Sequence, residues 1–545
     1  MRHKPTRLAG ALGLALACIG SPVAHAQSTL SGRVGSAADG ALEGVIVSAT
    51  KSGSPITISV VSDGAGRFAF PADKLTQGRY ALAVRAVGYE LGSAASVDVG
   101  GRAASDVEVT LRKTGDLASQ LTSAEWLLSM PGSAEQKRPL IECMSCHTLE
   151  RVVRSRYGAD ALATVLERMA GYANNTIAAR PQARIAHRAV RAEAVRQVAD
   201  YLATVNLSRG PTWPYALRTQ PRPSGRETRV VITEYALPRP TIAPHDVRTD
   251  AAGFVWYSNF VENTLGRLDP RTGEHAEWSY PVLKPGFPTG ALALEPDPDG
   301  NWWLAMMFQT GVAKFDVASK TFRLFPVPSA LDNDAMQQSL LMPAHWHVDG
   351  KVWTNDVDRQ RILRLDVATG TYESFEPFAG FGGTHSPYGM ASDEANNLYF
   401  MDFADENVGR VDAASGGSTI YPTPTPRSRP RRTMMDGQGR LWFAEFAADK
   451  VAMFDPKKET FREWDVPPHT YPYDVFLDRN GELWVGSMST DRVLRLDPTN
   501  GRAIAYLLPH STNIRRVFVD DSTTPVTLWI GNNHGAAIVK LQPLD

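Results

Sequence analysis

A repeating unit in the C-terminal half is the feature that most restricts the fold of this chain. Large aromatic residues recur there, and subtracting their positions gives steps of 47, 50, 46, 43, 42 and 45 residues. Each unit holds an apolar strand, a turn with Asp or Gly, and an aromatic strand such as "LWFAEF". Four short strands in roughly 40–50 residues are typical of one blade of a β-propeller. The aligned aromatics are Trp256, Trp303, Trp353, Tyr399, Trp442, Trp484 and Trp529.

The two ends of the repeat region complement each other. Its first strand, "VVITEYALP", matches the strands that close the units, whereas the last unit, ending in "AAIVKLQPLD", lacks such a strand. We therefore expect residues 229–545 to form a seven-bladed propeller whose first strand completes the last blade. Closure of this kind leaves no sheet edge open.

Residues 28–112 alternate apolar and polar side chains between Gly and Asp turns, which predicts β-strands. This segment resembles the carboxypeptidase regulatory-like family, and the resemblance implies a small β-sandwich with a structural or adhesive role. The residues that carry it are Gly32, Val34, Leu42, Gly44, Val45, Asp63, Gly64, Gly66, Phe68, Phe70, Gly78, Tyr80, Gly88 and Tyr89.

The first 26 residues have the pattern of a secretory signal peptide. A basic start precedes the apolar run 8–20, and Ala24-His25-Ala26 forms a small-x-small cleavage site. The pattern predicts a periplasmic or secreted protein; a membrane anchor and lipid attachment at Cys18 are the alternatives. The run is too short to span a bilayer, and no later segment predicts a transmembrane helix. A net charge of −1 gives no indication of a nucleic-acid partner.

Residues 141–150, "IECMSCHTLE", contain the spacing C-x-x-C-H. Once the signal peptide is removed, Cys143 and Cys146 are the only cysteines left. The spacing is the attachment signature of haem c, in which both thiols bond to the haem and His147 supplies the proximal iron ligand. A thioredoxin-like pair would need a βαβ setting, and zinc would need further Cys or His ligands. We therefore expect a covalent haem.

Residues 115–207 show the apolar spacing of helices, and the Pro-, Gly- and Arg-rich residues 208–228 are typical of a linker. The stretch "CMSCHTLERVVRSRYGADALATVLERMAGY" resembles small class I-type cytochrome c domains and implies an all-α haem domain. In that resemblance Met169, which lies 169 − 147 = 22 residues after His147, is the distal ligand. Met/His ligation raises the reduction potential and suits electron transfer. His187 is the alternative ligand.

The repeat region resembles the virginiamycin B lyase (streptogramin lyase) family, as in "SPYGMASDEANNLYFMDFADENVGRVD" and "YPYDVFLDRNGELWVGSMSTDRVLRLDPTNG". Members open a macrocyclic depsipeptide ester by elimination, with a His general base and Mg²⁺ held by Glu. The corresponding positions on blades six and seven are Tyr473 and Arg515. Pro-His remains only at Pro244-His245, where Ala243 replaces Glu. We therefore do not expect the elimination machinery, and no catalytic residue is assigned.

Polar residues at the strand ends of the propeller form a second candidate site. Arginines on blades five to seven suit an anionic ligand, and acidic residues on neighbouring blades suit Mg²⁺ or Ca²⁺. Alternatively, acids and arginines neutralise each other and the channel is structural. The candidate residues are His245, His345 (or His347), Tyr388, Arg431, Tyr473, Arg515, Asp356, Asp402 and Glu445.

The predicted fold class is a multidomain chain with an N-terminal β-sandwich, a small all-α cytochrome c-like domain and a C-terminal seven-bladed β-propeller. The predicted function is one-electron transfer through the haem, with a propeller that binds a substrate or redox partner. The electron donor is a redox partner protein or a small molecule. The alternatives are a C–O lyase with an attached haem domain and a haem-sensing or adhesive binding protein.

Overall fold

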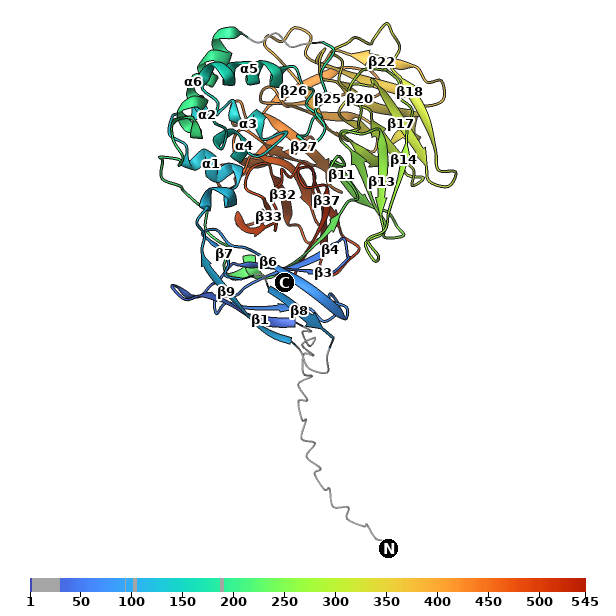
Figure 1. Cartoon of the computed structure of the whole chain (residues 1–545). Coiled ribbons are helices and arrows are strands. Elements are labelled where there is room, and N and C mark those ends of the chain that lie inside the picture. Colours follow the sequence, from blue (N-terminus) through green and yellow to red (C-terminus); the bar gives the residue numbers. More distant parts are fainter. Residues whose placement is uncertain (2–29, 94, 101–104, 187–190) are drawn as a thin grey trace.

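The computed structural model describes residues 1, 30–93, 95–100, 105–186 and 191–545 (Figure 1). Apart from Met1, the predicted signal peptide lies outside the described residues. Among the described residues, no helix is long and apolar enough to cross a membrane.

Two sheets packed face to face form the N-terminal β-sandwich, as predicted. One sheet has the order β2-β1-β9-β7 with β5 beside β1, and the other contains β4-β3-β6-β8. Alternate side chains of strands such as β5 and β6 point into the shared core, which is why the sequence alternates. The strands are β1 (Leu30–Ser36), β2 (Gly40–Ala41), β3 (Ile46–Lys51), β4 (Ile56–Val61), β5 (Arg67–Phe70), β6 (Gly78–Arg85), β7 (Tyr89–Leu91), β8 (Ala95–Val99) and β9 (Ser105–Lys113).

Six four-stranded antiparallel sheets follow as blades one to six of the propeller. Blade one contains β11 (Pro244–Thr249), β12 (Val255–Asn259), β13 (Thr264–Leu268) and β14 (His275–Ser279). Blade two contains β15 (Leu294–Pro296), β16 (Trp302–Ala305), β17 (Gly311–Asp316) and β18 (Thr321–Pro326). Blade three contains β19 (Leu341–Met342), β20 (Lys351–Asp356), β21 (Arg361–Asp366) and β22 (Tyr372–Phe375). Blade four contains β23 (Pro387–Ser392), β24 (Leu398–Asp402), β25 (Asn407–Val411) and β26 (Ser418–Pro422). Blade five contains β27 (Pro430–Met435), β28 (Leu441–Glu445), β29 (Lys450–Asp455) and β30 (Thr460–Asp465). Blade six contains β31 (Pro472–Leu477), β32 (Leu483–Ser487), β33 (Arg492–Asp497) and β34 (Arg502–Leu507).

A side-chain hydrogen bond explains why the aligned tryptophans recur. Each lies in the second strand of its blade, and in four blades its indole N–H donates to an Asp carboxylate six residues earlier in the preceding turn. The distances are 2.7 Å for Trp256 and Asp250, 2.9 Å for Trp303 and Asp297, 2.8 Å for Trp442 and Asp436, and 2.9 Å for Trp484 and Asp478. The bond satisfies a buried indole donor and fixes the hairpin that starts the blade.

The seventh blade joins strands from both ends of the repeat region. Strands β35 (Phe518–Asp520), β36 (Thr527–Asn532) and β37 (Ala537–Pro543) are completed by β10 (Val230–Ala236). Strands β10 and β37 pair antiparallel over their full length, from Val230 opposite Pro543 to Ala236 opposite Ala537. The predicted closure is therefore confirmed.

The sandwich is joined to the seventh blade by backbone pairing, which the sequence did not predict. The outer edge of β10 pairs antiparallel with β4, from Val231 opposite Val60 to Tyr235 opposite Ile56. Blade seven and half of the sandwich thus form one eight-stranded sheet, with β4 and β37 on either side of β10 (Figure 1). An exposed edge on each partner is covered in this way.

The predicted fold class is wrong for residues 115–207. The chain is mostly β-structure, and the described residues contain no self-contained all-α cytochrome domain. The helices are α1 (Ser123–Ser129), α2 (Ala134–Lys137), α3 (Leu140–Cys143), α4 (Glu150–Val153), α5 (Ala159–Ala170) and α6 (Ala192–Val205), and only α5 and α6 exceed seven residues. The 3₁₀ turns are Leu117–Gln120, Leu207–Arg209 and Gly225–Thr228, and α7 (Trp346–Asp349) lies in blade three.

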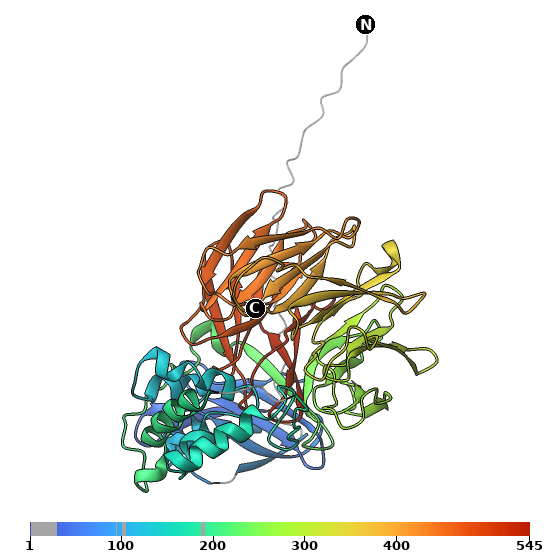
Figure 2. The ribbon, with the colours of Figure 1, turned by 90° about the horizontal axis from the view of Figure 1, so that it is seen from above.

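The physical reason is that this segment does not bury its apolar side chains by itself. The helices share one apolar cluster around Trp126 and Leu140, but Tyr471 of the propeller packs against it. Ala173 and Ile177, which follow α5, belong to the largest apolar cluster of the propeller. We call residues 115–207 the cap; in Figures 1 and 2 its teal helices lie beside the orange and red blades.

The predicted linker, residues 208–228, is packed along the cap. The Trp213 indole donates to the Val205 carbonyl over 2.6 Å, and the Arg218 amide donates to the Ser129 hydroxyl over 2.7 Å. Farther along, the Arg222 guanidinium donates to the Glu43 carbonyl of the sandwich over 3.0 Å. This segment therefore connects the cap to the N-terminal domain.

Candidate functional site

One face of the propeller gathers the strand ends that the sequence singled out. On this face the inner strand of a blade begins and the second strand ends. The first residue of the inner strand therefore lies opposite the last residue of the second strand. We call it the entrance face. The register pairs Pro244 with Asn259, Pro387 with Asp402, Pro430 with Glu445, and Pro472 with Ser487.

The cap lies on the entrance face and contacts loops of several blades. The Ala124 amide donates to the Ser489 carbonyl of blade six over 2.9 Å. Glu142 forms a 3.7 Å ion pair with Arg429, which directly precedes the inner strand of blade five. At blade three, the Asn174 amide donates to the Gln337 side chain over 3.1 Å. The cap therefore stands between this face and solvent.

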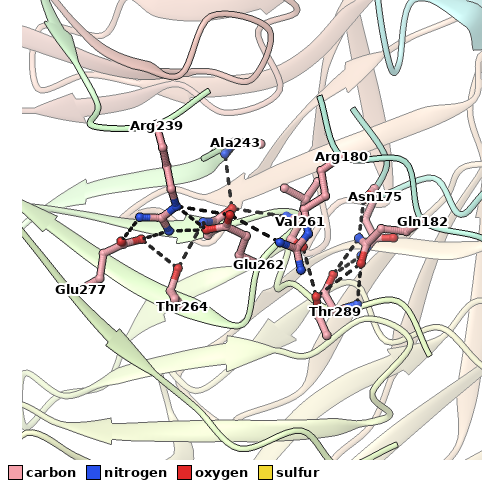
Figure 3. A network of polar contacts seen from close by, with 11 residues as sticks. Asn175, Arg180, Gln182, Arg239, Ala243, Val261, Glu262, Thr264, Glu277 and Thr289 are labelled. Carbon is pink, nitrogen blue, oxygen red and sulfur yellow. Dashed lines mark hydrogen bonds and ion pairs between the residues drawn. The ribbon is translucent and has the colours of Figure 1, made fainter. Parts of the chain in front are cut away.

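A polar network fastens the segment after α5 to blades one and two (Figure 3). The Asn175 amide donates to the Thr289 carbonyl over 2.7 Å, and the Gln182 side chain accepts from the Thr289 amide over 2.9 Å. Arg180 reaches Glu262 over 3.6 Å. Glu262 in turn accepts from Arg239, which also donates to Glu277 over 3.0 Å. The network thus extends from the cap into blade one.

The C-x-x-C-H segment begins at the C-terminus of α3 and forms a tight turn. The amides of Cys146 and His147 both donate to the Cys143 carbonyl, over 3.3 and 3.4 Å. Both cysteines are free, and burial raises the pKa of Cys143 to about 12, so its thiol is protonated at neutral pH. The His147 Nδ1 lies 2.9 Å from the Thr148 carbonyl. Nδ1 is therefore the protonated nitrogen, and Nε2 is left with the lone pair that binds a metal.

The turn rests on blade seven of the propeller. The Asn513 side-chain amide donates to the carbonyls of Met144 and Ser145, over 3.1 and 3.2 Å. Arg515 also donates to the Ser145 carbonyl. Both residues between the two cysteines are thus held by the propeller. Two thiols and an imidazole with a free Nε2 fit the donor set that a covalent haem requires.

Neither predicted distal ligand is confirmed. Met169 lies near the end of α5 and is 38% exposed, unlike a side chain enclosed against a haem face. His187 lies outside the described residues. The identity of the distal ligand therefore stays a prediction from the sequence.

Buried ion pairs neutralise several charged residues of the entrance face. Asp246 accepts from both terminal nitrogens of Arg432, over 2.7 and 3.0 Å, and lies 2.8 Å from the His245 Nδ1. Burial lowers the pKa of His245 to about 3, so its ring is neutral at neutral pH. Because its imidazole is oriented by Asp246 and fully buried, His245 contributes to an internal network.

A second neutralised group lies around Arg516. Its guanidinium reaches Glu295 over 3.1 Å and Asp474 over 3.6 Å, and Glu295 also accepts from Arg248. The interpretation of mutual neutralisation therefore describes these residues well.

Arg431 differs from Arg432 and Arg516, because it forms no ion pair within the described part of the chain. Its guanidinium carbon lies 3.6, 4.2 and 4.1 Å from the ring centres of Phe403, Phe446 and Tyr473. The Tyr473 hydroxyl is 2.5 Å from the Tyr388 hydroxyl. Burial lowers the pKa of Arg431. The sequence predicted this cluster in part, but it did not indicate that aromatic rings surround the cation.

Of the three acidic residues predicted to bind a cation, two have separate partners, and Glu445 has no hydrogen-bond partner among the described residues. Asp356 pairs with Arg361 over 2.8 Å, and Asp402 pairs with His385 over 2.7 Å. Burial raises the pKa of Glu445 to about 8, with a smaller contribution from Glu463. The three carboxylates share no contact in the described structure, so the predicted cation site stays a prediction.

A different donor group lies in blade four, and sequence reasoning predicted only its Asp402. One ligand atom each of His385, Asp402 and Asp405 lies within 4.8 Å of the others. His385 also stacks on Phe378, with ring centres 4.2 Å apart. The sequence signal for His385 was the string "THSPYG", which places a histidine two residues before the inner-strand proline.

His345 does not join the entrance face. It follows the inner strand of blade three, and its Nδ1 lies 2.9 Å from the Ser392 hydroxyl, at the far end of β23. At blade three, Gln337, which precedes the inner strand, contacts Asn174 of the cap instead. Blade three has no proline before its inner strand, so alignment by sequence placed His345 at the wrong end.

Comparison with known families agrees with these assignments at both ends of the chain. Residues 29–112 match the carboxypeptidase regulatory-like domain, and residues 382–544 match the virginiamycin B lyase family. The C-x-x-C-H segment lies outside both matched ranges. No curated protein matches the chain.

A solved structure gives the same fold for the propeller. A streptogramin B lyase structure is 20% identical with a TM-score of 0.50, covering 59% of this chain and 100% of its own. The virginiamycin B lyase from Staphylococcus aureus is 19% identical with a TM-score of 0.49, covering 57% of this chain and 99% of its own. The chain thus joins an N-terminal carboxypeptidase regulatory-like domain to a virginiamycin B lyase-like β-propeller.

Proposed function

We propose that this chain is an exported haem protein that transfers single electrons. Cys143 and Cys146 attach the haem through thioether bonds, and His147 binds the iron. The observation that supports this most is the C-x-x-C-H turn, in which the Thr148 carbonyl orients the His147 ring and leaves Nε2 free. The N-terminal pattern in residues 1–26 supports a periplasmic or secreted location.

The residues around the turn hold it in position. When bound, the haem supplies one-electron chemistry. Asn513 and Arg515 fix the two residues between the cysteines, so the thiols and the ring keep one orientation. The electron comes from a redox partner protein or a small-molecule donor. The propeller serves as the platform for that partner or for a substrate.

The test is expression in the periplasm of a host that attaches haem c, followed by denaturing gel haem staining and a reduced-minus-oxidised visible spectrum. We expect covalent haem in the wild type and loss of stable attachment in Cys143→Ala and Cys146→Ala. Cys18→Ala is the matched control, because the signal peptide is removed. Equal staining of all variants, or a wild type without haem, would show that the assignment is wrong.

The second candidate is a lyase, favoured by the family match over residues 382–544 and by the shared propeller fold. A relative from Staphylococcus aureus was solved with quinupristin. Opening of quinupristin by this chain, unaffected by Cys143→Ala, would support the lyase. Tyr473 and Arg515 occupy the positions where the family carries histidines, and the cap lies on the entrance face. We therefore expect no turnover.

A further inference from the structure

His534 lies in the loop that joins β36 to β37, on the entrance face of blade seven. The Asn532 carboxamide oxygen accepts from the backbone amides of His534 and Gly535, over 3.1 and 2.9 Å. These two bonds fix the loop, so the position of the His534 backbone is set by the last blade.

The two ring nitrogens of His534 form no hydrogen bond within the described structure. Both nitrogens are also buried. A buried donor or acceptor without a partner destabilises the folded state, so a pair of them calls for an explanation. A ligand that binds one nitrogen would provide it.

Residues at the same end of blade seven as His534 contact the C-x-x-C-H turn. The register of blade seven pairs Phe518 with Trp529, so Arg515 and Asn532, each three residues further toward the same end, lie together at the end of the blade that carries His534. Arg515 donates to the Ser145 carbonyl inside the C-x-x-C-H turn, and Asn513 holds the same turn. The propeller loop that carries His534 and the cap turn that carries the proximal ligand therefore face each other.

We propose that His534 is the second axial ligand of the haem iron, opposite His147. This inference rests on the proposed function. The cap then supplies the two thioethers and one imidazole, and the propeller supplies the other imidazole. The iron joins the two parts of the chain, and Met169 stays at the surface.

Ligand identity has a consequence that can be measured without any activity. An iron with two imidazoles is low-spin, and its potential lies below that of the same iron with imidazole and thioether, because Met ligation raises the potential. His534→Met should therefore raise the midpoint potential. His534→Ala should keep the covalent haem and lose the low-spin signal, and added imidazole should restore that signal.

The experiment compares wild type, His534→Ala, His534→Met and Met169→Ala by haem stain, visible spectrum, electron paramagnetic resonance and potentiometry. His510→Ala is the matched control, because this histidine of blade seven is bound to Glu234. We expect the control and Met169→Ala to keep the wild-type spectrum. A low-spin spectrum that survives in His534→Ala, or is lost in Met169→Ala, would overturn the inference while leaving the covalent haem assigned.

Two further outcomes are decisive. Electron–nuclear double resonance on the wild type counts the imidazoles bound to iron, so the test stands even if His534→Ala fails to fold. Two imidazoles, with the signal of one lost in His534→Met, support the inference, and one imidazole in the wild type refutes it. A wild type without covalent haem would overturn the proposed function and this inference together.

Discussion

Replacing Glu445 by Gln should change how the stability of the protein depends on pH. Glu445 ends β28 on the entrance face and is fully buried. Burial raises its pKa from 4.5 to about 8, and the negative charge of Glu463 adds to the effect. At neutral pH the carboxyl group of the folded protein is therefore mostly protonated, whereas in the unfolded chain it is ionised.

The magnitude follows from the difference between the two pKa values. Between about pH 4.5 and pH 8 the folded state binds one proton more than the unfolded state, so the free energy of unfolding falls as pH rises. The contribution is fully present below about pH 4.5 and is lost as pH rises through about 8. A shift of 8 − 4.5 = 3.5 units corresponds to at most about 5 kcal/mol.

The assay is urea denaturation of wild type and Glu445→Gln at about pH 5 and about pH 8.5, followed by tryptophan fluorescence. Because Gln is uncharged and similar in shape, we expect the variant to be more stable than wild type at the higher pH and nearly equal at the lower. Difference infrared spectroscopy should show a protonated carboxyl band that the variant lacks. Glu463→Gln, which removes the neighbouring charge, should reduce the slope without abolishing it. An identical pH slope in wild type and Glu445→Gln would refute the reasoning.

Three further perturbations test the packing of the propeller and its neighbours. Asp246→Asn leaves the buried Arg432 without its carboxylate and should lower the free energy of unfolding in denaturant by about 3–5 kcal/mol. Asp246→Leu combined with Arg432→Met should recover much of that loss. Equal losses in the two variants would contradict the pairing. Gln182→Ala removes bonds to Thr289 and should increase protease cleavage and hydrogen exchange in residues 171–186 only; unchanged protection would argue against the network. A chain lacking residues 28–112 exposes the edge of β10 and should self-associate in sedimentation experiments, whereas a stable monomer would count against edge protection.

The propeller and the sandwich could be predicted because each depends on local patterns. A strand with one buried face alternates by necessity, and the bond between Trp256 and Asp250 recurs at one spacing in four blades. Both patterns can be recognised in the sequence without knowledge of long-range contacts. The closing strand was predictable for the same reason, since β10 resembles the strands that it replaces.

The cap could be predicted only in part. Residues 159–170 and 192–205 have helical spacing and are helical, but the segment between them has no periodicity. Ala173 and Ile177 are ordinary apolar residues in the sequence, and only the propeller makes them core residues. An isolated all-α domain was therefore the wrong expectation.

The candidate site shows the same limit for charged residues. Arginine pairs are visible in the sequence, but it gives no indication that Arg432 meets Asp246 across the ring whereas Arg431 lies among aromatic rings. His534 is not among the predicted site residues, because in the sequence it looks like a loop or surface residue. Its buried nitrogens become evident only when the loop is placed beside the C-x-x-C-H turn.

The position of β10 sets an order of events during synthesis. One neighbour, β4, is made about 170 residues before it, by subtraction of 60 from 231, and the other, β37, about 310 residues after it, by subtraction of 231 from 542. The partner strand β4 is therefore already present when β10 emerges, whereas the ring cannot close until residues 537–543 emerge. Residues 143–147 therefore emerge long before the seventh blade, on which the C-x-x-C-H turn rests, is complete.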